Sequence, residues 1–200
     1  KLRLGISLYS IDKGSSNAVL LSWAQAMALA GQVQLDTSAE VMAGSAIAFK
    51  IPSTAAQGSS SPLSWDDSAK EVKFGYDGAD GLHTVWVDNR FSMPFRLQLA
   101  ADNGIGGIVL EGPAAQDVEV GVWDAVARYA AQGRPELVYP NQSQFTVRWQ
   151  SSDGSLADEG KAAVQWTAPS NPGQYSVSAS ISDGAAEFKS TASVRVVSPT

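Results

Sequence analysis

One short stretch of the sequence holds the first candidates for chemistry. His83 is the only histidine of the chain, and Asp77 and Asp80 precede it in the run DGADGLH, which is rich in turn-forming residues. The chain has no cysteine, which excludes thiolate metal sites, cysteine nucleophiles and disulfides. A single imidazole argues against a histidine-based metal site and against a Ser-His-Asp triad. We therefore expect a hairpin turn here, with His83 in a surface or hydrogen-bonded role.

Glu111 is a second candidate, because it directly follows the apolar run GGIVL at residues 106–110. Such a run is typical of a strand that is buried on both faces. A carboxylate at its end must reach solvent or a partner, because burying it unpaired is costly. We expect Glu111 at the carboxyl end of this strand.

The first 133 residues combine strand and helix patterns. We predict strands at residues 2–8, 73–76, 84–87 and 106–110, and helices at 22–30, 93–102 and about 118–131. Ser22, Ser92 and Asp117 are suited to cap the three helices, and Gly31, Gly104 and Gly133 to end them. Residues 53–64 form a polar loop of low complexity.

Strand, helix, buried strand and helix in succession indicate a parallel α/β fold. The segment between the first strand and the helix at residue 93 is too long for a simple connection. We expect an inserted α+β subdomain at about residues 13–88.

The pattern changes after residues 133–135. Four segments alternate apolar and polar residues, at 144–150, 163–167, 174–182 and 187–197, with turn signals between them. They predict an all-β sandwich over residues 134–200, with Trp149 and Trp166 in its core. The expected division is thus 1–133 and 134–200.

Composition excludes several function classes. A hydrophobic content of 44% and a charged content of 17% are typical of globular proteins. The net charge is −6 and the 14 basic residues form no run, which argues against a nucleic-acid partner. No apolar stretch is long enough for a membrane span, and no signal-peptide pattern is present. We expect no cofactor, and a fragment or processed product of a secreted or cell-surface protein.

Three stretches of the first half carry a family resemblance. They are KLRLGISLYSID (1–12), GLHTVWVDNRFSMPFRLQLA (81–100) and DNGIGGIVLEGPAAQDVEVGVWDAV (102–126). In order and spacing they resemble the C-terminal part of family 18 (chitinase-like) glycoside hydrolases, in the spore-cortex and cell-wall branch. The second half, with QWTAPSNPGQYSV (165–177), resembles bacterial immunoglobulin-like or PKD-like domains.

The resemblance implies the last two strand–helix units of a TIM-type barrel, with the insertion between them and an immunoglobulin-like sandwich after them. It implies action on N-acetylated β-1,4 glycans of the chitin or peptidoglycan type. The family's acid belongs to a D-x-x-D-x-D-x-E motif, and the stretch here that mimics it holds His83 and Val85 at the acidic positions. We therefore expect no catalytic acid in this chain. The remaining N-terminal barrel portion or another chain would be its partner.

The resemblance also points to substrate-binding residues. Tyr9 and Asp12 follow the first strand, and Glu111 stands where the family has a Trp on which a sugar stacks. Trp86 either walls the glycan cleft or packs the insertion against the barrel. Glu111 in the place of Trp leaves an alternative open, a non-catalytic structural or carbohydrate-binding surface protein with a degenerate barrel.

Overall fold

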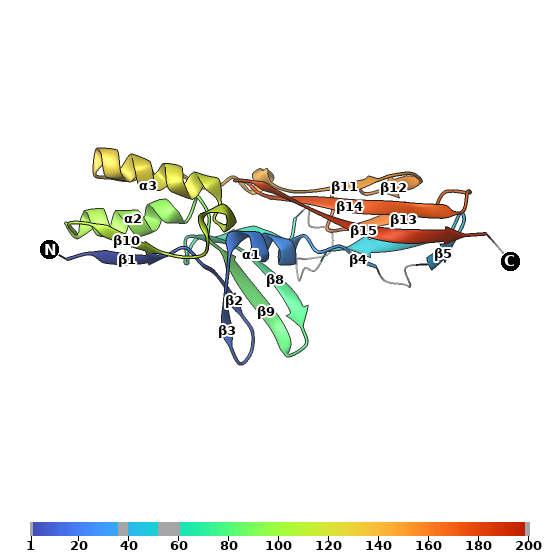
Figure 1. The fold of residues 1–200 in the computed structure, drawn as a ribbon, viewed down its shortest axis with the longest axis horizontal. Helices are drawn as coiled ribbons and strands as arrows, with labels where there is room; N and C mark the ends of the chain where they lie inside the picture. The colour runs from blue at the N-terminus through green and yellow to red at the C-terminus, as the bar shows by residue number, and fades with distance from the viewer. Residues whose placement is uncertain (1, 36–39, 52–60, 199–200) are drawn as a thin grey trace.

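The computed structural model describes residues 2–35, 40–51 and 61–198, and this part is mainly β-structure with three α-helices (Figure 1). The helices are α1 (Trp23–Ala30), α2 (Met93–Asp102) and α3 (Val120–Gln132). The strands, in chain order, are β1 (Leu4–Ser7), β2 (Ser10–Lys13), β3 (Ala18–Leu21), β4 (Gln34–Leu35), β5 (Glu40–Met42), β6 (Ala46–Lys50), β7 (Ser64–Asp66), β8 (Glu71–Gly78), β9 (Gly81–Val87), β10 (Ile108–Glu111), β11 (Phe145–Ser151), β12 (Ser155–Ala157), β13 (Ala163–Thr167), β14 (Gly173–Asp183) and β15 (Glu187–Val197). The polar loop predicted at 53–64 lies mostly outside the described residues. No helix in the described part is both long and apolar enough to span a membrane.

β1 and β10 form a two-stranded parallel sheet, in which Leu4 lies opposite Ile108 and Ser7 opposite Glu111. One face of this sheet packs against α2 and α3, and the shared core contains Ile6, Leu8, Met93, Leu97, Val118 and Val122. The prediction that the strand at 106–110 is buried on both faces is wrong, because only one face of β10 is covered by the helices. The other face is exposed, and Val109 on it keeps 46% of its surface accessible. The predicted adjacency of the two parallel strands, with both helices packed on them, is confirmed.

The helix ends follow the capping patterns with two corrections. Ser92 precedes α2 as predicted, but its side chain makes no capping hydrogen bond, because its hydroxyl donates to Asp88 and to the Asn89 carbonyl. Ser22 caps α1 in a reciprocal capping box with Gln25, and Gly133 ends α3 in the left-handed conformation at φ 72°. The prediction that Asp117 caps α3 is wrong. The cap is Glu119, whose carboxylate accepts the Gly121 N–H at 2.8 Å, because Asp117 lies two residues earlier, at the end of a 3₁₀ helix.

An antiparallel sheet of five strands, in the order β3-β2-β9-β8-β7, follows β1. Its central hairpin pairs β8 with β9 and turns tightly at residues 79–80, with Gly81 at a φ of 119°. The two strands predicted here are therefore present and longer than expected. Together with α1, this sheet forms most of the segment that the sequence predicted to be an insertion.

The structure differs from the expected division at residue 133. Two four-stranded sheets pack face to face in the second half, in the orders β11-β14-β15-β5 and β12-β13-β6-β4. Three of these strands, β4, β5 and β6, come from residues 34–50, within the segment predicted as the insertion. They were not expected in the sandwich because a short strand shows which face is buried but not which sheet it joins. Trp149 and Trp166 lie in this core, as predicted.

One continuous core joins the sandwich to the five-stranded sheet. It includes Met27 of α1, Val85 of β9, Phe49 of β6 and Trp166 of β13. Asp183, fully buried at the end of β14, strengthens this connection. Its Oδ2 accepts hydrogen bonds from the Trp23 indole and from the Asn89 amide, both at 2.9 Å.

Candidate functional site

Two of the four predicted site residues lie at the carboxyl end of the parallel pair. Glu111 ends β10, is exposed, and sits opposite Ser7, the last residue of β1. Tyr9 lies two residues after the end of β1, is half-buried, and directly precedes β2. Parallel strands end at the same edge of a sheet, so the carboxyl ends of β1 and β10 meet here, as the sequence predicted for Glu111.

Trp86 lies on the open face of the five-stranded sheet. Cross-strand partners share a face, and the row through Trp86 runs across five strands from Leu20 through Ile11, Trp86 and Lys73 to Ser64. Leu20 is 58% exposed and Ile11 39%. Tyr9 is two residues before Ile11, so the chain leads directly from the end of β1 to the strand beside Trp86.

Polar groups border the Trp86 indole on one side. Its Nε1 approaches Asp66 Oδ2 at 3.5 Å, and the same oxygen accepts the Lys73 ammonium at 2.8 Å. The Lys73 bond and the Ala69 backbone N–H lower the pKa of Asp66 to about 2, so this carboxylate is ionised throughout the physiological range. An aromatic surface with a fixed ion pair at its edge can pack on an apolar face of a ligand and bind its hydroxyl groups.

Asp12 does not join Trp86. It lies opposite Val85, one register position away, and therefore on the face that packs against the core, where it is 6% exposed. Its carboxylate accepts the Tyr76 hydroxyl at 2.7 Å and pairs with His83 Nδ1 at 2.8 Å. Burial, together with the hydrogen bond to Asp12, raises the pKa of Tyr76 to about 12, which keeps the phenol neutral.

Sequence reasoning missed Arg96, the residue that connects the two sheets. Its Nη1 donates to the Ser7 carbonyl at 2.6 Å and lies 3.0 Å from Asp88 Oδ1, while its Nη2 pairs with Glu71 of β8. Burial disfavours its charge, but Asp88 and Glu71 outweigh that effect and raise the pKa of Arg96. The guanidinium therefore fixes the carboxyl end of β1 beside β8 and β9.

Asp88 is the buried member of this cluster. It is 2% exposed, accepts the Ser92 hydroxyl at 2.6 Å, and its Oδ2 has no hydrogen-bond partner. Burial outweighs the attraction of Arg96 and raises the pKa of Asp88 to about 6. Of Asp88, Ser92 and Arg96 only Arg96 lies within α2, so the four-residue spacing of the three was no helical signal in the sequence.

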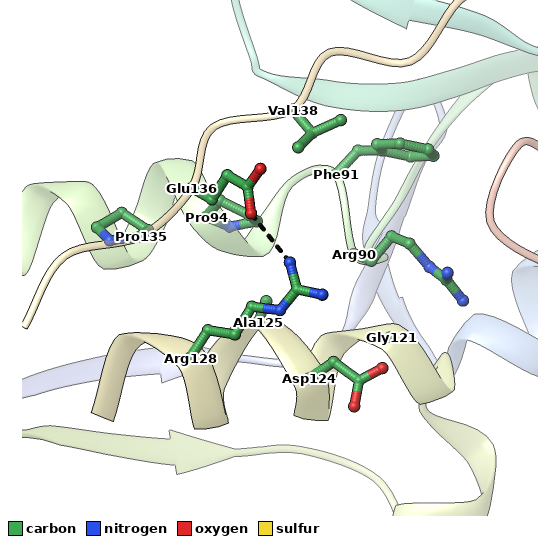
Figure 2. Close-up of a pocket in the computed structure, with 10 residues that line it drawn as sticks. All are labelled: Arg90, Phe91, Pro94, Gly121, Asp124, Ala125, Arg128, Pro135, Glu136 and Val138. Atoms are coloured by element: carbon green, nitrogen blue, oxygen red, sulfur yellow. Dashed lines mark hydrogen bonds and ion pairs between the residues drawn. The ribbon is translucent and has the colours of Figure 1, made fainter. Parts of the chain in front are cut away.

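A separate pocket of about 240 Å³ lies between the start of α2, the helix α3 and the segment that follows α3. Figure 2 shows Arg128 of α3 pointing toward Glu136, and the two side chains form an ion pair at 2.9 Å. None of the four predicted site residues lines this pocket. Within the described residues, no group of three or more histidines and carboxylates could hold a metal ion.

Comparisons with known proteins returned no matching family model and no matching curated protein. The solved structures that are similar in part include two chitinases. A chitinase from Chromobacterium violaceum is 24% identical over 65% of this chain, with a TM-score of 0.41. The cell-surface-expressed multi-modular chitinase ChiW from Paenibacillus is 11% identical over 98% of this chain, with a TM-score of 0.32. The aligned regions span 33% of the first chain and 27% of the second, so this chain spans about a third or less of the length of each.

Proposed function

We propose that this chain binds N-acetylated β-1,4 glycans and belongs to a secreted or cell-surface glycoside hydrolase-like protein. The binding surface would run from the carboxyl end of β1 and β10, at Tyr9 and Glu111, onto the open sheet face at Trp86. The observation that carries the proposal is the Arg96 bridge, which holds these two regions beside each other through Ser7, Asp88 and Glu71. The preference for N-acetylated sugars rests on the sequence resemblance.

The exposed face of β1 and β10 supports a larger parallel sheet or barrel around this pair. Within the described residues each of the two strands pairs only with the other, and Val109 is exposed on the face that α2 and α3 leave open. Unpaired strand edges and open apolar faces promote aggregation unless they are covered. We propose that further strands of the same barrel protein cover them.

The carboxylates around the proposed surface support binding without cleavage by this chain. Asp12 is paired with Tyr76 and His83, Asp88 with Arg96, and Asp66 with Lys73. An acid that protonates a glycosidic oxygen must face the sugar and hold its proton near neutral pH. Unlike these three paired carboxylates, Glu111 is exposed, at the carboxyl end of β10. This arrangement favours the alternative of a non-catalytic glycan-binding role for the 200-residue chain.

The proposal is tested by titrating the purified chain with chitin-type oligosaccharides and with cello-oligosaccharides of equal length as the control. We expect saturable binding of the N-acetylated series, lost in Trp86→Ala, and no release of shorter sugars. Met42→Ala is the matched control, because Met42 is exposed on β5, in a sandwich sheet that holds none of the four predicted site residues. Equal binding by Trp86→Ala, or hydrolysis above a blank, would contradict the proposal.

A further inference from the structure

His83 is held between two carboxylates that come from different parts of the five-stranded sheet. Its Nδ1 lies 2.8 Å from Asp12 Oδ1 on β2, and its Nε2 lies 2.6 Å from Asp80 Oδ1 in the β8–β9 turn. The ring also lies against Tyr76, with centroids 4.7 Å apart and planes at 31°. His83 therefore contacts both hairpins of the sheet.

The geometry selects the protonation state of the ring. Only the imidazolium carries a proton on both nitrogens, so only this form donates to Asp12 and Asp80 at the same time. A neutral ring would direct one lone pair at a carboxylate oxygen. Tyr76 cannot supply the missing proton, because its hydroxyl already donates to Asp12 Oδ2 at 2.7 Å.

Two glycines lie so close to the His83 ring that neither could carry a side chain. A Cβ on Gly14, in the turn between β2 and β3, or on Gly78 at the end of β8, would lie 2.7 Å from a carbon of the His83 ring. The same turn is tied to Asp80, whose backbone carbonyl accepts the Ser15 hydroxyl at 2.8 Å. The tip of the β2–β3 hairpin therefore packs directly on the ring and on the β8–β9 turn.

We propose that His83 is a proton-operated clamp, in which the imidazolium holds the tip of the β2–β3 hairpin against the β8–β9 turn and loss of its proton loosens that tip. The titratable groups that contact the ring are Asp12 of β2, Tyr76 of β8 and Asp80 of the turn. The β2–β3 hairpin also carries Ile11, which is paired with Trp86 on the opposite face, and Leu20, which is paired with Ile11. The clamp therefore controls the order of that face, whether or not it binds a glycan.

The direction of the pH effect follows from the two carboxylates. Asp80 and then Asp12 raise the pKa of His83 above its ordinary 6.5, against the opposing effect of burial. A group whose pKa is raised by folding stabilises the fold fully below its unfolded pKa, and this contribution is lost as pH rises through the folded pKa. The hairpin tip should therefore be ordered near pH 6.5 and loosen as pH rises through the raised pKa of His83.

The test uses the fact that His83 is the only histidine of the chain. An NMR titration of its ring in the complete chain should give a pKa above 6.5. At a pH below that pKa, the ring ¹⁵N shifts should show that both nitrogens are protonated. Hydrogen exchange of the amides at residues 14–17, corrected for the intrinsic pH dependence, should lose protection as the ring titrates. A measured pKa at or below 6.5, or protection that is unchanged across the titration, would overturn the proposal.

Three variants separate the clamp from a general loss of stability. Asp80→Asn should lower the pKa of His83, and His83→Gln should remove the pH-dependent step in exchange at residues 14–17. Asp77→Asn makes the same charge change on the same hairpin without touching the ring, and should leave both readouts as in the wild type. A step that persists in His83→Gln would overturn the proposal.

Discussion

Asp12 and Trp86 lie on neighbouring strands of one sheet but point to opposite sides of it. Trp86 is paired with Ile11 and Asp12 with Val85, and adjacent residues of a strand alternate between faces. The two residues that the sequence grouped in one substrate-binding site therefore have separate roles, Trp86 on the open face and Asp12 in a polar cluster at the end of the packed face.

Asp12→Asn should lower stability while leaving Trp86 and its face intact. The substitution removes the charged acceptor of Tyr76 and His83, and hydrogen bonds to charged groups contribute roughly 1.5–3 kcal/mol each. Chemical denaturation should show a loss of this order. Asp77→Asn, an exposed carboxylate on the same sheet, is the control, and an equal loss there would contradict the assignment.

Glu111→Trp should strengthen binding of N-acetylated oligosaccharides. An indole at the carboxyl end of β10 would offer the apolar face on which the CH groups of a sugar pack, which a carboxylate lacks. The measurement is calorimetric titration of the complete protein, with Glu111→Gln as the control for loss of charge. Unchanged affinity in Glu111→Trp would show that the edge of β10 does not face the glycan.

Glu119→Ala should destabilise the fold by about 3 kcal/mol. The side chain is fully buried, caps α3, and receives three hydrogen bonds from the Arg90 guanidinium and one from its backbone N–H. Removing one partner of a buried pair leaves the other uncompensated, although Arg90 is 38% exposed and recovers part of its hydration.

The matched control for that measurement is Glu136→Ala. Glu136 forms an ion pair with Arg128 in which both side chains are more than 60% exposed, so less than about 1 kcal/mol should be lost. Equal losses in the two variants, measured by denaturant titration, would contradict a special role for the buried pair.

The raised pKa of Asp88 should make the free energy of unfolding fall as pH rises from 3.8 to about 6. Burial raises its pKa to about 6, so the folded state holds this proton more tightly than the unfolded state does. Its stabilising contribution is present below 3.8 and is lost as pH rises through about 6, by roughly 3 kcal/mol in total. Asp88→Asn, which keeps an acceptor for Ser92, should remove this component from denaturation curves recorded across that range. A pH profile that is identical in the variant would refute it.

Residues 134–200 should not fold when expressed alone. Without β4, β5 and β6, both sandwich sheets lose strands, and Phe49, fully buried with its ring 6.0 Å from that of Trp166, is missing from the core. In the complete chain, Phe49→Ala should cost about 3–5 kcal/mol, whereas Met42→Ala, which is 55% exposed on β5, should cost far less. A cooperatively folded fragment, detected by circular dichroism and thermal melting, would contradict this prediction.

Local patterns in the sequence were sufficient for the elements whose signal lies within a few residues. The strand before Glu111, the helix that Ser22 caps and the helix that Gly133 ends are determined by periodicity and capping chemistry, which depend on neighbouring residues. The parallel pairing of β1 with β10 followed from the order of strands and helices together with the family resemblance. These predictions needed no knowledge of distant contacts.

Only the tertiary structure decided which elements share a sheet and which side chains meet. β5 and β6 join sandwich strands more than a hundred residues later, because hydrophobic alternation defines a buried face without specifying the neighbouring strand. Arg96 reaches Ser7 across 89 positions, and His83 reaches Asp12 across 71. Such polar contacts form where the packed core brings side chains within hydrogen-bond distance, and the spacing of residues along the chain does not encode that distance.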